Sequence, residues 1–242
     1  MLSKNEVLKN KEVRQAIYYT INQEEILSSI FHGKAYSSYF PLDYGNYVIN
    51  NETIKNITND EVAKKTLKDA GWNYEYDTWT KEINGRKQKL NFTLTVNKNN
   101  EIRIQVAEKI KEQLEKIGIK ATIKIISENQ YENTLKTKNY ELLLTGVYNS
   151  ISPDITTFLG ENNLCNYENN EINTILEEVR NVRDEKTLKE KYNKIVEIYI
   201  QETPFISLYR NQNTIIYSQG LMGNMSPNNY NIFYNIVDWY RK

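Results

Sequence analysis

The residue types that most often carry out covalent or metal chemistry are scarce in this sequence. Histidine and cysteine occur once each, as His32 and Cys165. A single cysteine cannot form an internal disulfide, and a single histidine cannot supply a histidine-rich metal site. Cys-x-x-Cys, His-Glu-x-x-His and glycine-rich phosphate motifs do not occur in the sequence. We therefore predict neither a bound metal nor a cofactor.

The sequence also lacks a recognisable set of hydrolase catalytic residues. A nucleophile paired with histidine would have to use His32, and no Gly-x-Ser-x-Gly motif is present to pair with it. Adjacent acids such as Glu177 and Glu178 point in different directions from a helix, so their spacing defines no glycosidase pair. We predict a protein that is not an enzyme. A hydrolase with buried carboxylates is the alternative, because a perturbed carboxylate is invisible in a sequence.

A ligand-binding site is predicted in the loop that follows a buried strand. The stretch from Tyr140 to Val147 contains Leu142, Leu143 and Leu144, a run typical of a strand buried on both faces. It is followed by Tyr-Asn-Ser-Ile-Ser-Pro-Asp at 148–154, which is polar and rich in turn formers. Ligands of open α/β sheets bind beyond the carboxyl ends of the strands. This loop is the candidate site, and a connector that binds nothing fits the sequence equally well.

Several helices and strands must position this loop, and the apolar spacing predicts them. Apolar residues at helical spacing from Ile102 to Ile117 predict a helix closed by Gly118, and alternation over 119–125 predicts a following strand. Asn84-Gly85 predicts a type I′ turn in a hairpin over 79–96. A final short strand is expected over 205–209. Three further helices are predicted from residues that cap a helix N-terminus. Thr58 and Glu61 form one capping box, Ser127 and Gln130 form a second, and Asp184 caps the third helix. The pattern predicts an α/β fold with helices on both faces of the sheet.

Composition excludes several classes of protein. The 242 residues carry 31 Lys and Arg against 31 Asp and Glu, so nothing steers the whole chain to nucleic acid. With 39% hydrophobic residues the chain has enough material for a globular core. The longest apolar runs are too short for a membrane span, and residues 1–13 lack the apolar core of a signal peptide. We expect either a cytosolic protein or a fragment whose export signal lies outside it.

The order of the segments resembles a known family. Val-Arg-Gln-Ala-Ile at 13–17, followed by Thr-Ile-Asn-Gln-Glu-Glu-Ile at 20–26, is similar to a signature of extracellular solute-binding proteins of family 5. These are the oligopeptide, dipeptide and nickel receptors of ABC importers. The similarity continues through Ala-Lys-Lys-Thr-Leu-Lys-Asp-Ala-Gly-Trp at 63–72, Gln-Leu-Glu-Lys-Ile-Gly-Ile at 113–119, Pro153-Asp154, Phe158-Leu159 and Phe-Ile-Ser-Leu-Tyr at 205–209.

The resemblance implies a periplasmic-binding-protein-like lobe of type II, with a mixed β-sheet flanked by helices on both faces. Family members are longer and have an N-terminal lobe before the Val-Arg-x-Ala helix. Residues 1–205 are therefore expected to be the C-terminal substrate-binding lobe, and residues 206–242 a crossover strand and tail that return to the missing lobe. Such a receptor closes its two lobes on a ligand and docks on a membrane permease. It is extracellular or periplasmic and anchored as a lipoprotein.

The resemblance also implies ligand-binding residues and a ligand class. Oligopeptides or dipeptides are expected, with a nickel complex, a sugar or another small molecule as the alternative. Tyr148 stands where an aromatic residue such as Trp is common in the family, but Ile151 stands where peptide receptors place the acid that clamps the peptide amino group. Arg210 is a candidate partner for an anion. The predicted ligand-binding residues are Gly146, Val147, Tyr148, Asn149, Ser150, Asp154, Tyr209 and Arg210.

Overall fold

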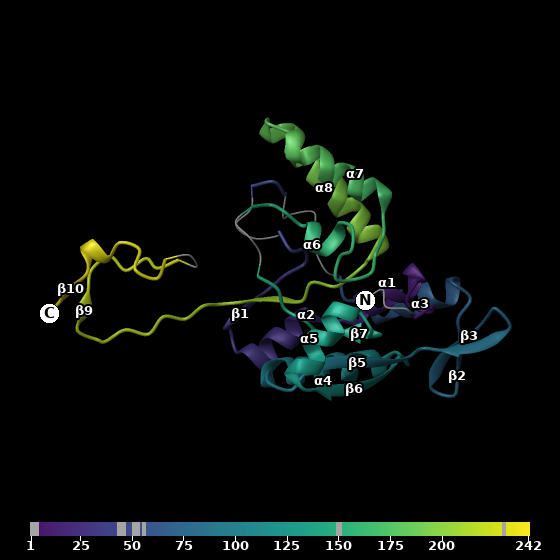
Figure 1. Cartoon of the computed structure of the whole chain (residues 1–242). Helices are drawn as coiled ribbons and strands as arrows, with labels where there is room; N and C mark the ends of the chain where they lie inside the picture. The colour runs from purple at the N-terminus through teal and green to yellow at the C-terminus, as the bar shows by residue number, and fades with distance from the viewer. Residues whose placement is uncertain (1–4, 43–46, 50–53, 55–56, 149–151, 229–230) are drawn as a thin grey trace.

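A computed structural model describes residues 5–42, 47–49, 54, 57–148, 152–228 and 231–242 of the chain. At its centre lies a three-stranded parallel sheet in the order β6-β5-β7 (Figure 1). The strands are β5 (Asn91–Asn97), β6 (Lys120–Ile126) and β7 (Leu142–Leu143). Leu94 of β5 is in register with Ile123 on one side and Leu142 on the other. Parallel pairing makes all three strands end at the same edge of the sheet.

The helix α4 (Glu101–Lys116) connects β5 to β6, as the strand-helix-strand pattern predicted. It begins at Asn100, whose side chain accepts a hydrogen bond from the backbone N–H of Arg103 at 2.9 Å. It ends before Gly118, which has the left-handed φ of +86° that favours glycine. Its inner face packs on the sheet through Val106, Ala107, Ile110 and Leu114. Burial of this apolar stripe against β5 holds the helix on the sheet.

The strand predicted over 140–147 is much shorter than expected. β7 comprises two residues, although Leu144 adds one further bond by donating its backbone N–H to the carbonyl of Thr95 at 3.0 Å. Residues 146–148 are exposed, so the interpretation of this run as a strand buried on both faces is wrong beyond Leu144. Helix α5 (Glu128–Thr137) precedes β7 and has the predicted capping box of Ser127 and Gln130.

The hairpin predicted over 79–96 is partly right. β2 (Asn73–Glu75), β3 (Thr78–Ile83) and β4 (Arg86–Lys89) form an antiparallel sheet. Asn84 and Gly85 make the turn with positive φ angles of 53° and 72°, as a type I′ turn requires. Residues 91–97, however, form the parallel strand β5 and not the second hairpin strand. The alternation of apolar residues from Leu90 to Val96 suits either partner, and burial under α4 decides between them.

Two further groups of helices are present, of which the first shares its apolar core with the sheet and the second belongs to a separate apolar core. The first is α1 (Lys11–Thr20), α2 (Gln23–Ile26), the π-helical η1 (Leu27–Phe31) and α3 (Asp60–Asp69). The capping box predicted for α3 is wrong: Asn59 caps the helix, and the Thr58 hydroxyl donates to the carbonyl of Ile21 at 3.2 Å. The second group is α6 (Thr156–Leu159), α7 (Asn170–Glu178), η3 (Val179–Asn181) and α8 (Glu185–Glu202), with Asp184 as the predicted cap of α8. No helix among the described residues combines the length and the hydrophobicity needed to cross a membrane.

The chain leaves the body of the molecule through a second strand pair. β1 (Ala35–Ser37) pairs with β8 (Tyr209–Asn211), so the strand predicted over 205–209 begins only at Tyr209, and it is not the last strand of the chain. Beyond it the tail runs away from the rest of the molecule and folds back on itself, in yellow in Figure 1. There β9 (Leu221–Met222) pairs with β10 (Tyr240–Arg241), next to the short helix η4 (Ile236–Asp238).

Candidate functional site

The carboxyl edge of the parallel sheet gathers polar side chains from three elements, next to a glycine that follows a fourth. Asn97 ends β5, Arg103 lies in the first turn of α4, Tyr131 comes from α5 and Gly146 follows β7. Asn97 and Tyr131 are buried, whereas Arg103 is half-buried and Gly146 is exposed. This is the edge at which open α/β sheets bind ligands.

The guanidinium of Arg103 is held along one side by its neighbours. Its Nη1 donates to Asn97 Oδ1 at 3.0 Å and to the Tyr131 hydroxyl at 3.3 Å. The Tyr131 hydroxyl in turn donates to the carbonyl of Leu144 at 3.0 Å, and Asn97 Nδ2 donates to Glu128 Oε2 at 3.1 Å. These bonds fix the orientation of both partners, so Arg103 has one defined position at the end of the strands.

The other side of the guanidinium is open. Among the described residues, Arg103 Nε and Nη2 form no hydrogen bond, and Arg103 has no carboxylate partner. A Cβ atom added to Gly146 would lie 2.7 Å from Arg103 Nη2, which is closer than real Cβ atoms approach. Glycine at 146 therefore leaves this space to the guanidinium.

Tyr209 and Arg210, two of the predicted site residues, lie on β8 beside this edge. The Tyr209 ring packs on Phe31 with centroids 4.4 Å apart, and the Arg210 guanidinium lies 5.4 Å from the centre of the Tyr36 ring. Burial raises the pKa of the Tyr209 phenol, and the positive charge of Arg103 opposes that rise. The charge of Arg103 thus acts on the Tyr209 phenol across space, and the direct ring contact of Tyr209 is with Phe31.

The predicted loop residues divide into three groups. Val147 is exposed, and Tyr148 is fully exposed with a relative exposure of 106%. Asn149 and Ser150 lie outside the described residues. Asp154 accepts a hydrogen bond from the backbone N–H of Thr156 at 2.9 Å, and bonding to Thr156 lowers its pKa.

Asp154 faces a different part of the molecule from Arg210. Its other electrostatic neighbours are Arg180 of η3 and Tyr192 of α8, and Tyr192 donates its hydroxyl to the carbonyl of Pro153 at 2.5 Å. Burial, followed by the charge of Asp154, raises the pKa of Tyr192 to about 12. The interactions of Asp154 therefore run toward α7 and α8, whereas Arg210 lies on Tyr36.

Sequence reasoning missed Arg103, Asn97 and Tyr131. One signal was available for Arg103, which stands three residues after the cap Asn100 in the first turn of a 16-residue helix. A cation is disfavoured there by the helix dipole, so an arginine at that position calls for another explanation. Asn97 and Tyr131 gave no signal, because only the meeting of β5 with α5 places them beside Arg103.

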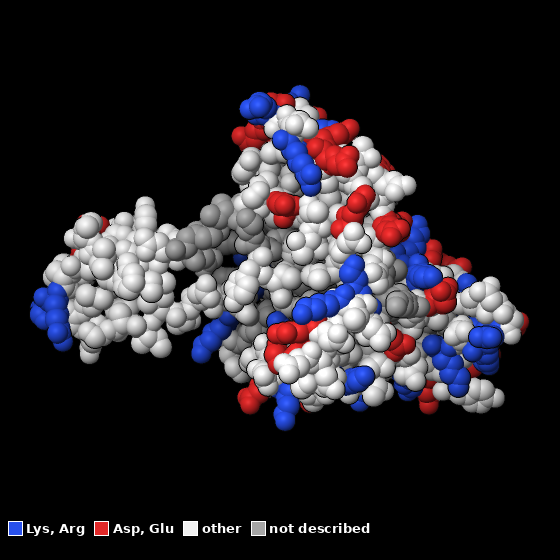
Figure 2. Space-filling model, viewed as in Figure 1, with Lys and Arg blue, Asp and Glu red and all other residues white. Residues whose placement is uncertain are grey.

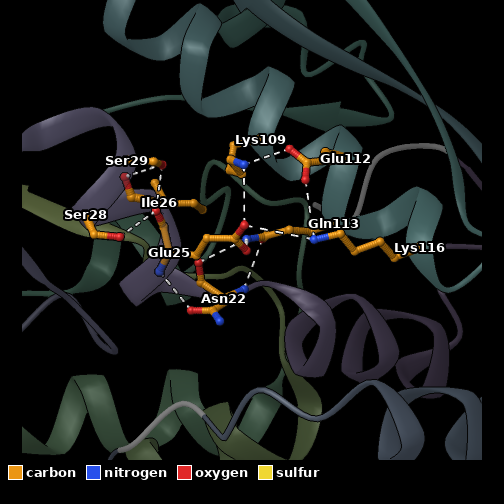
Figure 3. Close-up of polar contacts among 9 residues, drawn as sticks. All are labelled: Asn22, Glu25, Ile26, Ser28, Ser29, Lys109, Glu112, Gln113 and Lys116. Carbon is orange, nitrogen blue, oxygen red and sulfur yellow. Dashed lines mark hydrogen bonds and ion pairs between the residues drawn. The ribbon is translucent and has the colours of Figure 1, made fainter.

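A second polar cluster lies farther along α4 (Figure 3). Buried Gln113 accepts from the backbone N–H of Asn22 at 3.0 Å and donates to Glu25 Oε2 at 2.8 Å. Lys109 contacts Glu25 at 3.4 Å and Glu112 at 2.7 Å. The side-chain bond from Gln113, followed by nearby lysines, lowers the pKa of Glu25. Every charge in this cluster has a partner of opposite sign, so it joins α2 to α4 and leaves nothing for a ligand.

Other surface features offer no competing site. Figure 2 shows lysine, arginine and acidic side chains interspersed over the body, with few charges on the tail. A depression of about 500 Å³ between α7 and α8 is lined partly by Glu171, Glu190, Lys191 and Lys194. Its lysines pair with acids, Lys194 with Glu171 at 3.8 Å and Lys191 with Glu178 at 2.6 Å. No group of three or more metal-ligating side chains occurs within the described ranges.

Comparison with known proteins identifies a family and a curated relative. Residues 1–170 match the family described as "Bacterial extracellular solute-binding proteins, family 5 Middle". The oligopeptide-binding protein AppA of Bacillus subtilis (strain 168) is 27% identical over 248 residues, covering 98% of this chain and 45% of AppA. The chain thus spans less than half the length of that curated relative.

Solved structures share the fold. AppA from Bacillus subtilis in complex with a nonapeptide has a TM-score of 0.77 at 23% identity, over 99% of this chain and 49% of AppA. An oligopeptide-binding protein from Thermus thermophilus with a pentapeptide gives 0.78 at 20% identity, over 98% and 43% of the two chains. NikZ from Campylobacter jejuni with Ni(L-His) gives 0.77 at 21% identity, over 98% and 50%. These similarities confirm the predicted α/β fold of the periplasmic-binding-protein type.

Proposed function

Because the chain belongs to the bacterial extracellular solute-binding proteins of family 5, we propose that it contributes one side of a cleft that captures oligopeptides for an ABC importer. The relatives are binding proteins, and we extend this to a chain that binds its solute without converting it. The whole receptor would deliver the peptide to a permease in the membrane. We place it outside the cytoplasmic membrane, held there by a lipid anchor.

The observation that carries this proposal is the open carboxyl edge of the β6-β5-β7 sheet. Two groups suited to peptide recognition come from this part of the chain and keep bonding capacity, namely the guanidinium of Arg103 and the exposed ring of Tyr148, which follows β7. An extended peptide offers carbonyls, N–H groups and charged ends that such groups bind. We keep Gly146, Val147, Asp154, Tyr209 and Arg210 as further proposed contacts, together with Asn149 and Ser150.

We also propose that the tail packs on a second lobe. Residues 212–242 contain three charged side chains, Asp238, Arg241 and Lys242. Ile216 and Val237 are 91% and 90% exposed, and further apolar side chains are half or more exposed, among them Ile232, Phe233 and Tyr240. An apolar patch of this kind marks a contact surface. Residues 1–205 then form one lobe and residues 206–242 the crossover to the other.

Titration of the isotopically labelled chain with a mixed pool of short peptides tests the proposed ligand class. Shifts of backbone amides clustered around residues 144–158 and 209–210 are expected. A titration with nickel and L-histidine runs in parallel, because NikZ is solved with that complex. Shifts at the same amides with nickel and histidine, and none with peptides, would contradict the peptide proposal and favour the alternative solute.

Hydrogen exchange tests the role of the tail. Because the apolar side chains of residues 212–242 face solvent in this chain, we expect their amides to exchange fast compared with those of α4 and β5. Adding the N-terminal half of a longer family member should slow them. Full protection of the tail in the monomeric chain would contradict the proposal.

A further inference from the structure

We propose that the described lobe contains a joint, at which its helical part turns against its sheet part, and that a bound solute restricts this turn. The sheet unit comprises α1, α3, α4 and the β6-β5-β7 sheet, which share one apolar core. The helical unit comprises α6, α7 and α8, which surround another core. The link to a solute rests on the proposed function, whereas the joint itself follows from the fold alone.

The two cores are separate groups of side chains. The first includes Ile17 of α1 and Leu114 of α4, and the second includes Ile172 of α7 and Ile195 of α8. The helical unit, in green in Figure 1, projects from the sheet, and its main helix contact with the sheet unit is that of α8 with α1. Interdigitated side chains within one core resist sliding, but two cores joined through polar groups can move relative to each other.

Arg14 and Gln15 of α1 hold one end of α8. The Arg14 side chain is 2% exposed, and its Nε and Nη2 donate to the carbonyl of Glu202 at 3.0 and 2.6 Å. Nε also donates to the carbonyl of Thr203 at 3.1 Å, and Gln15 donates to the carbonyl of Gln201 at 2.8 Å. The last carbonyls of a helix lack partners within the helix, and here α1 supplies donors to three consecutive ones. The units are thus tied at the C-terminal end of α8.

The same guanidinium is anchored on the sheet unit. Its Nη1 donates to the carbonyl of Leu8 at 3.0 Å and to that of Lys9 at 2.8 Å, and the Leu8 side chain is buried in the first core. One planar head group therefore bonds to both units. Carbonyl oxygens accept hydrogen bonds over a broad range of directions, so α8 can rotate through a limited angle without losing these bonds. This is the geometry of a pivot.

Gln23 of α2 holds two of the segments by which the chain passes between the units. Its side chain is 3% exposed, and Nε2 donates to the carbonyl of Ser38 at 3.3 Å and to that of Ser207 at 2.7 Å. Phe40, two residues after Ser38, is buried in the second core, and Phe205, two residues before Ser207, packs against it. One amide from the sheet unit thus fixes both segments next to the point where they enter the helical unit.

The proposed contacts for a solute are divided between the two units. Arg103 lies in α4, and Tyr209 packs against the first core, so both belong to the sheet unit. Asp154 accepts from the backbone N–H of Thr156 in α6 and so belongs to the helical unit. A solute that contacts both sides would hold the units at one angle, because its affinity favours the arrangement in which both sets of contacts form.

Residual dipolar couplings test the joint without any ligand. Backbone N–H couplings of the weakly aligned, labelled 242-residue chain are fitted for α4, β5 and β6 and, separately, for α7 and α8. The helical unit should show a smaller alignment magnitude than the sheet unit, because rotation about the joint averages its couplings. A single alignment tensor of one magnitude for both units would overturn the joint.

Two variants test the side chains that hold the joint. Arg14→Met and Gln23→Met remove the bonds between the units, and each should increase the difference in alignment magnitude. Arg86→Met, at an exposed position of β4, is the matched control for the arginine variant and should leave the difference unchanged. Gln15→Met loses only its bond to α8 and tests the same contact should Arg14→Met fail to fold. A difference that stays the same in all variants would show that these side chains do not hold the joint.

Peptides then test the link to the solute. A peptide from the mixed pool that shifts the amides of residues 144–158 should bring the two alignment magnitudes together. Such shifts with an unchanged difference would overturn the link and leave the peptide proposal standing. No shifts with any peptide would remove the peptide proposal, whereas the difference in the free chain would still support the joint.

Discussion

The two polar regions of helix α4 differ in how completely their charges are satisfied. In the middle and last turns, Lys109, Glu112 and Gln113 form bonds with one another or with Asn22 and Glu25. In the first turn, Arg103 uses one nitrogen for the fold and leaves the other edge open. Both regions join α4 to neighbouring elements, yet one is closed and the other keeps bonding capacity. A closed polar cluster stabilises a fold, and an anchored but incomplete one is suited to binding a ligand.

Burial explains why the closed cluster exists at all. Gln113 is 2% exposed, and its amide bonds to both the N–H and the carbonyl of Asn22 at the corner between α1 and α2. That corner ends α1 and leaves the N–H of Asn22 without a backbone partner, whereas the carbonyl of Asn22 also accepts from the Ile26 N–H at 3.2 Å. A side-chain amide with one acceptor and two donors can satisfy both groups and still reach Glu25. No comparable backbone requirement acts on the open edge of Arg103.

The largest effect is expected for Gln113→Leu, which keeps the volume and removes all three bonds. The free energy of unfolding should fall by about 1–3 kcal/mol, because the buried N–H of Asn22 is left without a partner. Denaturant titration measures the change. Gln105→Leu, on the exposed face of the same helix, is the matched control and should change stability by less than about 0.5 kcal/mol. Similar values for both variants would refute the structural role of the closed cluster.

A smaller effect is expected for Gly146→Ala at the open edge. The added Cβ meets the flexible end of Arg103, so the side chain shifts and stability changes by less than about 1 kcal/mol. The shifts of the amides of residues 144–158 with the peptide pool should weaken severalfold. Arg86→Gln, at an exposed position of β4, serves as a control for the shifts. An unchanged response in Gly146→Ala would show that the space beside Arg103 Nη2 is not part of the proposed peptide site.

The smallest effect is the pH dependence contributed by Glu25. Its pKa is lowered in the folded chain, by the bond from Gln113 first and by nearby lysines next. A lowered pKa contributes stability above the unfolded value of about 4.3, and this contribution is lost as the pH falls through the folded pKa. Glu25→Gln should therefore be slightly less stable than wild type at pH 7, and the gap should close in acid. A gap that stays constant from neutral pH to acid would mean that the carboxylate charge contributes nothing.

Much of the local structure was predictable because its causes are local. The apolar stripe of α4 and the capping box at Ser127 depend on residues within a few positions of one another, and both predictions are confirmed. The type I′ turn at Asn84 and Gly85 is confirmed for the same reason. The cap of α3 was predicted one residue early, because Thr58 and Asn59 are both good caps and the contact of Thr58 with Ile21 decides between them.

Pairing partners and the candidate site were decided by contacts between distant parts of the chain. The alternation from Leu90 to Val96 suits a hairpin or a parallel strand, and the packing of α4 selects the parallel one. By itself the sequence determined the family resemblance and the α/β alternation, and it predicted a binding loop at 148–154. The tertiary structure alone brought Asn97, Arg103 and Tyr131 together, since hydrogen bonds across 6 and 28 positions form only after the strands and helices pack. Whether a polar side chain is satisfied depends on such neighbours, and no local pattern encodes it.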